Sequence, residues 1–210
     1  MDKTLVFLVL AMSGLFALAI TYNKLQTKTV KSNHENFKIK SFNSNEFQVI
    51  ENPGYGDCLF YCFKQALESI GVKTTIKQLR YKVSKSMDKE KLETLKTIYL
   101  VAKNDKNYDI LKDYYFMENV HTLKDLRKVI MTRVYYGDDM AIAALEEYTG
   151  INVVVISNGV EQIRLEKPKG NNYIVLVLKN IHYRLLGTRN GKFVFKYKPF
   201  EAIEAAKIKF

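Results

Sequence analysis

The chain has 210 residues, enough for one well-filled globular domain and little more. Its 47% hydrophobic content excludes an intrinsically disordered protein, and its two cysteines exclude a disulfide-rich scaffold. The net charge of +11 is compatible with an anionic membrane or an acidic partner, but the scattered lysines form no nucleic-acid-binding motif, so nucleic acid is not an expected partner.

The N-terminal segment is apolar. Residues 5–20 read LVFLVLAMSGLFALAI and carry no charge. With its flanks the segment covers residues 4–22, about 28 Å as a helix, which predicts a transmembrane anchor (1–22) lying in a lipid bilayer. A cleavable signal peptide is an alternative, because Ala17-Leu18-Ala19 has the form of a cleavage site. A third interpretation of the segment is a helix buried in the core of the domain.

Basic residues set the expected orientation. Lys24, Lys28 and Lys31 follow the apolar segment, within a polar stretch (23–45) that we interpret as a tether. By the positive-inside rule this flank stays cytoplasmic. The sequence therefore predicts a single-pass protein of a host or virion membrane, with its main domain (46–198) on the cytoplasmic side.

Helices are predicted next. A short strand candidate, 47–50, leads into a turn-rich stretch, 52–56, and then an apolar helical pattern begins at Cys58 and ends at Gly71. The helices that follow are expected over 76–86, 90–102, 109–117 and 123–132, with caps at Thr75, Asp88 and Thr122.

Strands dominate the second half. A helix opened by Asp138 or Asp139 closes at Gly150, and strands are expected over 151–156, 173–178, 183–186 and 193–197. Asn158-Gly159 and Asn190-Gly191 are hairpin-turn signals. Helices followed by a sheet predict an α+β fold, an α/β sandwich, with 199–210 as a C-terminal helix or tail.

Cys58 is the candidate nucleophile. It follows a glycine-rich turn that contains Gly54, Gly56 and Asp57, and it opens a helix. The positive end of the helix dipole favours a thiolate there, and the free amides of the first turn suit an oxyanion. The alternative is a structural, buried cysteine.

A thiol nucleophile needs a base, and the sequence offers three histidines. His34 lies in the tether and His121 precedes a helix cap. His182 enters a strand after a long apolar one. A histidine at the rim of a sheet, facing a helix N-terminus, is typical of cysteine hydrolases, so His182 is the candidate base.

Four segments together resemble one known family. The run Gly56-Asp57-Cys58-Leu59-Phe60 resembles the nucleophile motif of the OTU (ovarian tumour) cysteine proteases, which are deubiquitinases. Residues 135–145 are similar to that family's aromatic-Gly-Asp segment, 151–156 to the strand after it, and His182-Tyr183 to its histidine-aromatic pair. The chain resembles the compact OTU proteins of large DNA viruses in particular.

The resemblance implies a papain-related fold with Cys58 on a central helix and a C-terminal, mostly β sheet. It implies cleavage of isopeptide bonds in ubiquitin or ubiquitin-like conjugates, with no cofactor and no metal. Cys58 would attack the carbonyl, and His182 would take the thiol proton and later protonate the leaving amine. The amides of Cys58 and of the Gly56-Asp57 turn would hold the oxyanion.

Two departures from the family pattern leave other functions open. Tyr55 stands where the family has aspartate, and Arg184 stands where it has an acidic or amide residue that orients the histidine. Asn180 and Asn172 are candidates for that orienting role. The alternatives are a weak or inactive ubiquitin-binding protein of the same fold, and a basic membrane-associated structural or nucleic-acid-binding protein.

A surface for ubiquitin's arginine-containing tail should also be acidic. The sequence offers five acidic residues for it: Asp109, Asp113, Glu118, Glu146 and Glu147.

Overall fold

A computed structural model describes residues 46–163 and 168–209 of the chain. The predicted anchor, 1–22, and the predicted tether, 23–45, lie outside the described residues. Among the helices of the described ranges, none has the length and apolar character needed to cross a membrane.

All but one of the predicted helices are confirmed, and local capping explains where most of them begin. The side chains of Thr75, Asp88 and Thr122 accept hydrogen bonds from the first turns of the helices that follow them, as predicted. Gly150 ends its helix with a φ of 67°. The helices of the first part of the domain are α2 (Cys58–Ser69), α3 (Ile76–Ser86), α4 (Lys89–Asn104), α6 (Leu123–Ile130) and α7 (Asp139–Thr149).

One predicted helix was wrong in its extent. The segment 109–117 forms two shorter pieces, α5 (Tyr108–Asp113) and the 3-10 helix η2 (Tyr115–Asn119). Tyr114 ends α5, and its N–H bonds back to the carbonyls of Ile110 and Leu111. The break lets Phe116 and Met117 turn into the hydrophobic core.

The second half forms a mixed sheet whose strand order is β1-β5-β4-β2-β3. β2 and β4 are parallel, and the other pairs are antiparallel. The Asn158-Gly159 turn joins β2 to β3 with φ angles of 50° and 74°, which confirms that hairpin. The strands are β1 (Phe47–Ile50), β2 (Ile151–Ser157), β3 (Val160–Glu161), β4 (Asn172–Lys179), β5 (His182–Thr188) and β6 (Phe195–Lys196).

The second predicted hairpin, at Asn190-Gly191, does not pair as expected, because the strand after the turn pairs with β4 and not with β5. The segment after Asn190-Gly191 was expected to return along the preceding strand, but β6 pairs with the start of β4, at Asn172 and Tyr173. The reason is that β5 lies between β1 and β4, so both of its edges are already occupied. β6 therefore pairs with the part of β4 that extends past the end of β5.

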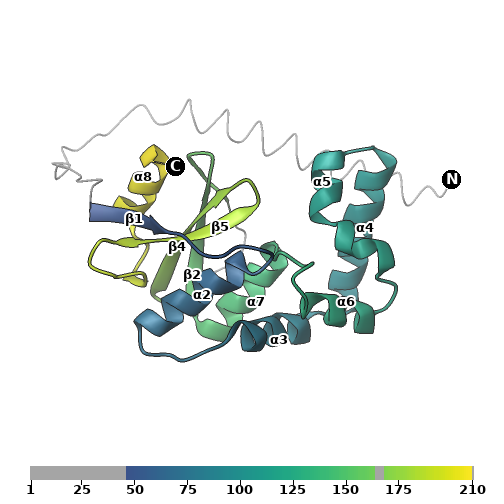
Figure 1. Cartoon of the computed structure of the whole chain (residues 1–210), viewed down its shortest axis with the longest axis horizontal. Coiled ribbons are helices and arrows are strands. Elements are labelled where there is room, and N and C mark those ends of the chain that lie inside the picture. Colours follow the sequence, from purple (N-terminus) through teal and green to yellow (C-terminus); the bar gives the residue numbers. More distant parts are fainter. Residues whose placement is uncertain (1–45, 164–167, 210) are drawn as a thin grey trace. The chain divides into compact units, whose positions relative to one another are not determined.

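Helices cover the sheet, as the α+β prediction requires (Figure 1). α2 packs against β5, and α7 packs against β2. α2 is the central helix, since most of its residues are buried, with Leu59, Phe60 and Phe63 fully so. A C-terminal helix, α8 (Phe200–Lys209), packs its alanine-rich side on the strands β2 to β5.

The pairing of β1 with β5 determines where the glycine-rich loop between β1 and α2 lies. Ile50, the last residue of β1, is opposite Leu185 in β5. Because the two strands are antiparallel, the chain that leaves β1 continues alongside β5 toward its first residue, His182. The loop before α2 is thereby delivered to the start of β5.

Candidate active site

Cys58 is the first residue of α2, and its side chain is enclosed. The residue is only 1% exposed. The backbone N–H of Tyr183, the second residue of β5, hydrogen-bonds to the thiol. The sulfur at the start of the central helix therefore lies against the residue that follows His182.

The protonation of Cys58 reflects two opposing effects. Burial raises the pKa of the thiol, whereas hydrogen bonds from the N–H groups of Tyr183, Leu59 and Cys58 lower it. The negative charge of Asp57 raises it further. Burial is the largest of these effects, and on balance the pKa of the thiol is raised, which favours the thiol form of Cys58.

His182 lies against the same loop. A Cβ added at Gly54 would come within 3.1 Å of Cε1 and 3.3 Å of Nδ1 of the imidazole. Gly54 also has a φ of 70°, a conformation that side-chain-bearing residues rarely adopt. A glycine is thus needed here both for the turn and for the close approach of the ring.

Asn52 ties this loop to β5. Its Nδ2 donates to the carbonyl of Tyr183 at 2.9 Å, and its Oδ1 accepts from the N–H of Gly54 at 3.1 Å. Nδ2 also lies 3.7 Å from the sulfur of Cys62, one helical turn after Cys58. One amide thus holds the loop under His182, the central helix and the start of β5 together; no local sequence pattern pointed to it.

The structure does not confirm the residues that were proposed to orient the imidazole of His182. Asn180 is exposed in the β4–β5 turn, with a φ of 51°. Asn172 begins β4, at the end opposite Lys179, which pairs with His182. The structure therefore does not bring Asn172 to the imidazole. Arg184 forms an ion pair with Glu51 at 2.8 Å.

The set of oxyanion donors also changes. The N–H of Asp57 donates to the carbonyl of Gly54 at 3.0 Å, so it is already engaged in the turn. This leaves the amides of Gly56 and Cys58 from the predicted set. Asp57 is the N-cap residue of α2, yet its side chain makes no capping hydrogen bond.

The carboxylate of Asp57 is instead held by two arginines. Arg80 donates from Nε to Oδ1 at 2.9 Å, and Arg133 donates from Nε to Oδ2 at 2.8 Å. Arg80 also donates to the carbonyl of Gly56 at 2.7 Å. No local sequence pattern pointed to this cluster, because an arginine within a helix, such as Arg80 in α3, is ordinarily exposed and because these contacts join distant segments.

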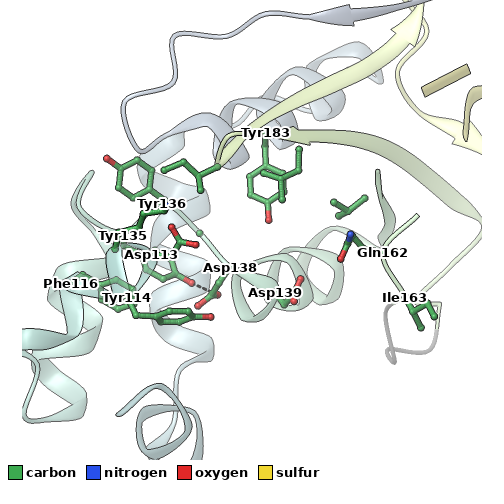
Figure 2. Close-up of a pocket in the computed structure, with 15 residues that line it drawn as sticks. Asp113, Tyr114, Phe116, Tyr135, Tyr136, Asp138, Asp139, Gln162, Ile163 and Tyr183 are labelled. Atoms are coloured by element: carbon green, nitrogen blue, oxygen red, sulfur yellow. Dashed lines mark hydrogen bonds between the residues drawn. The ribbon is translucent and has the colours of Figure 1, made fainter. Parts of the chain in front are cut away.

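A cavity of about 480 Å³ adjoins this centre (Figure 2). Tyr183 and Ile181, the neighbours of His182 in sequence, both line it. Figure 2 shows the ring of Tyr183 pointing into the cavity, across from Asp139. Its other lining residues include Asp113, Tyr114, Tyr136, Asp138, Gln162 and Ile163.

The cavity has an acidic wall. Burial, followed by the negative charges of Asp138, Asp139 and Asp113, raises the pKa of Tyr114 to about 12. Asp138 accepts hydrogen bonds from the hydroxyl of Tyr135 at 2.7 Å and the N–H of Ala141 at 3.0 Å through Oδ1. Its buried Oδ2 has no hydrogen-bond partner among the described residues.

Of the acidic residues that the sequence suggested for a substrate surface, Asp113 lines the cavity. Glu146 instead accepts a hydrogen bond from the N–H of Val153 at 2.7 Å, and Glu147 pairs with Lys169 at 2.8 Å. Asp138 and Asp139 were interpreted from sequence only as residues that open α7. Because helix capping was a sufficient local explanation for both residues, the sequence did not indicate that they line a cavity.

Solved structures with a similar fold complete the description. No protein-family model and no curated protein matches the chain. The structure is similar to an ovarian tumour (OTU) domain solved in complex with ubiquitin, with a TM-score of 0.51 and 20% identity over 77% of this chain and 83% of that one. The described part of the chain therefore has the α+β fold of OTU domains.

Two further similar structures are an OTU deubiquitinase from Wolbachia pipientis wMel and an OTU deubiquitinase from the same organism bound to ubiquitin. The first has a TM-score of 0.45 and 18% identity over 70% of this chain and 91% of that one. The second has a TM-score of 0.45 and 19% identity over 69% of this chain and 98% of that one.

Proposed function

We propose that the chain is an OTU-type thiol hydrolase that cleaves isopeptide bonds in ubiquitin or ubiquitin-like conjugates. The observation that carries the proposal is the meeting of Cys58, at the uncapped start of α2, with the first residues of β5, where His182 lies against the cysteine-bearing loop. This meeting occurs in a fold similar to that of a domain solved in complex with ubiquitin.

In the proposed reaction, His182 takes the proton of Cys58, and the sulfur attacks the isopeptide carbonyl. The amides of Gly56 and Cys58 hold the negative oxygen of the tetrahedral intermediate. Collapse of the intermediate breaks the C–N bond, and His182 returns the proton to the leaving lysine amine. Water, deprotonated by His182, then hydrolyses the thioester and restores the thiol.

The proposal is tested by incubating the purified full chain with a panel of ubiquitin dimers of different linkage. Cleavage of at least one dimer to monomers, with no added metal or cofactor, is the expected result. Absence of cleavage across the panel, and across dimers of ubiquitin-like modifiers, would contradict it.

The acidic cavity is proposed to receive the arginine-containing tail of the modifier. Asp113 and Asp139 line the same cavity as Tyr183, the second residue of β5, so a cationic side chain bound in this cavity would lead the tail toward Cys58. The double change Asp113→Asn, Asp139→Asn should raise KM about thirtyfold and leave kcat within about twofold, since each of the two charged contacts contributes about 1 kcal/mol.

Steady-state cleavage of a fluorogenic ubiquitin substrate checks this prediction. The matched control is Glu147→Gln, which removes a carboxylate of α7 that pairs with Lys169 and does not line the cavity. An equal rise of KM in the control, or none in the double variant, would contradict the assignment of the cavity.

A second candidate function is a weakly active or inactive ubiquitin-binding protein. Arg184 favours it: residues 182 and 184 of a strand point to the same side, and a guanidinium cannot accept a hydrogen bond from the imidazole. The side chain next to the proposed base is thus a cation paired with Glu51.

Restoring an acceptor at this position distinguishes the two candidates. Arg184→Asn should raise kcat about tenfold, because it supplies an oxygen beside His182, whereas Arg184→Ala removes the cation without supplying one. The comparison of these two variants in the same fluorogenic assay checks it. Equal kcat values for the two variants would exclude an orienting role for residue 184.

A further inference from the structure

We infer that Arg80 is a positioning residue: together with Arg133 it holds the Asp57 carboxylate away from the N-terminus of α2 and keeps the first amides of that helix free of a side-chain cap, so that they remain available to the sulfur and the oxyanion. The kinetic part of this inference rests on the proposed function, whereas its chemical part concerns the Cys58 thiol alone.

The capped helices of the domain show which hydrogen bond the Asp57 side chain would make if the arginines did not hold it. Asp88 accepts from the N–H of Lys91 at 2.8 Å, and Asp138 accepts from the N–H of Ala141 at 3.0 Å. Each is an N-cap with extended backbone angles. The helices α3, α5 and α6 also begin with a side-chain cap. Among α2 to α7, α2 alone begins without one.

Asp57 has the right residue type for a cap but a different geometry. Its φ and ψ are −103° and 1°, outside the extended region that capping aspartates adopt. It is 5% exposed, so its carboxylate is withdrawn from water as well as from the helix amides. A buried carboxylate needs partners, and both of its oxygens receive an arginine N–H.

Arg80 is built to hold this arrangement. It is 3% exposed, and its guanidinium lies 4.2 Å from the ring centre of Phe60. Its Nη1 donates to the carbonyls of Ile130 and Tyr135, at 2.6 and 3.1 Å. Nη2 lies 2.8 Å from Oδ1 of Asp57, so the guanidinium contacts this oxygen through two nitrogens. A lysine could not reproduce this planar set of contacts.

The consequence of releasing Asp57 follows from capping chemistry. A freed carboxylate would compete for the first amides of α2, which now point at the thiol and where the oxyanion is to be held. It would also bring a negative charge closer to the sulfur, and the charge of Asp57 already raises the pKa of Cys58. Further titratable residues near the thiol are Cys62, one turn later on α2, and His182 and Tyr183 at the start of β5.

The test measures the thiol directly. In a Cys62→Ala background, so that Cys58 is the only cysteine of the full chain, the rate of alkylation by iodoacetamide is followed between pH 6 and pH 11 (roughly the range over which protein thiols titrate). Arg80→Met should move the apparent pKa of alkylation upward by about one unit, which means about tenfold slower alkylation at neutral pH.

A second change separates positioning from simple destabilisation. Adding Asp57→Ala to Arg80→Met removes the carboxylate that would cap the helix and whose charge raises the pKa of Cys58, so the apparent pKa should return to that of the Arg80 parent or fall below it. Fluorogenic ubiquitin cleavage should follow the same order, with about a hundredfold loss of kcat in Arg80→Met and partial recovery in the double variant. A merely structural role predicts no recovery in either measurement.

Arg133 is a position where a substitution should leave the fold intact, since its side chain is 70% exposed. Arg133→Gln should shift the alkylation pKa in the same direction by a smaller amount, again reversed by Asp57→Ala. An unchanged pKa in both arginine variants, or a raised pKa that Asp57→Ala leaves in place, would overturn the inference. Because alkylation needs no ubiquitin, a failure of the proposed function would appear separately, as absent cleavage by the parent.

Discussion

Cys58→Ala and His182→Ala are each expected to lower the rate of ubiquitin-conjugate cleavage by about 10⁴-fold, the scale found when a nucleophile or its base is removed from a catalytic unit. The loss is large because no other thiol can reach the substrate carbonyl from this position. Since burial raises the pKa of Cys58, the proposed mechanism requires a base, and His182 is the residue proposed for it. The double variant should therefore be no slower than either single variant.

Cys62 supplies a matched control for the nucleophile. It lies one helical turn after Cys58, is fully buried, and its pKa is raised well above the usual value by burial. Cys62→Ala should cost about 1–2 kcal/mol of stability and leave kcat within about threefold of the parent. Turnover that survives Cys58→Ala, or that is lost equally in Cys62→Ala, would contradict the assignment of the nucleophile.

Gly56→Ala is expected to destabilise the domain more than an alanine substitution at Gly54, the other glycine of the loop before α2. A Cβ at Gly56 would lie 1.9 Å from the carbonyl oxygen of Arg133, a backbone atom that cannot turn aside. The φ of 86° adds strain for any side-chain-bearing residue. Overpacking and backbone strain together should reduce the free energy of unfolding by about 3 kcal/mol or more.

Gly71→Ala is the matched control for this prediction. Gly71 has a similar φ of 82°, but an added Cβ meets nothing within 4 Å. It should reduce stability by about 1 kcal/mol, from backbone strain alone. Urea denaturation followed by circular dichroism gives both values, and equal losses in the two variants would show that the contact between Gly56 and Arg133 is not tight.

What the sequence predicted correctly is mostly local. Capping residues such as Thr75 and Asp88 act on amides two or three positions away, so the pattern that marks a helix start contains the whole interaction. The start of α2 at Cys58 and the Asn158-Gly159 hairpin are signals of the same kind.

The contacts that could not be predicted from the sequence join residues far apart in the chain. The link from Asn52 to Tyr183 spans 131 positions, and the pair of Asp57 with Arg133 spans 76. No local periodicity encodes which distant groups meet, so these contacts were not predicted. The raised pKa of Cys58 was missed for the same reason, because burial of the sulfur depends on β5, which comes much later in the chain.

The strand β6 illustrates a related difficulty. Its turn signal, Asn190-Gly191, was recognised, but a turn does not determine the partner of the strand that follows it. The partner depends on which edges of the sheet remain free, and β1, from the other end of the domain, had already taken the outer edge of β5. Only the complete strand order answers that question.

The most direct test of the central claim is reaction of the full chain with ubiquitin that carries a C-terminal electrophile. We predict a covalent adduct one ubiquitin larger than the chain, attached at Cys58 by peptide mass spectrometry, absent in Cys58→Ala and retained in Cys62→Ala. Ubiquitin that binds without forming this adduct would support the inactive binding protein instead, and an adduct at Cys62 would contradict the account of the nucleophile.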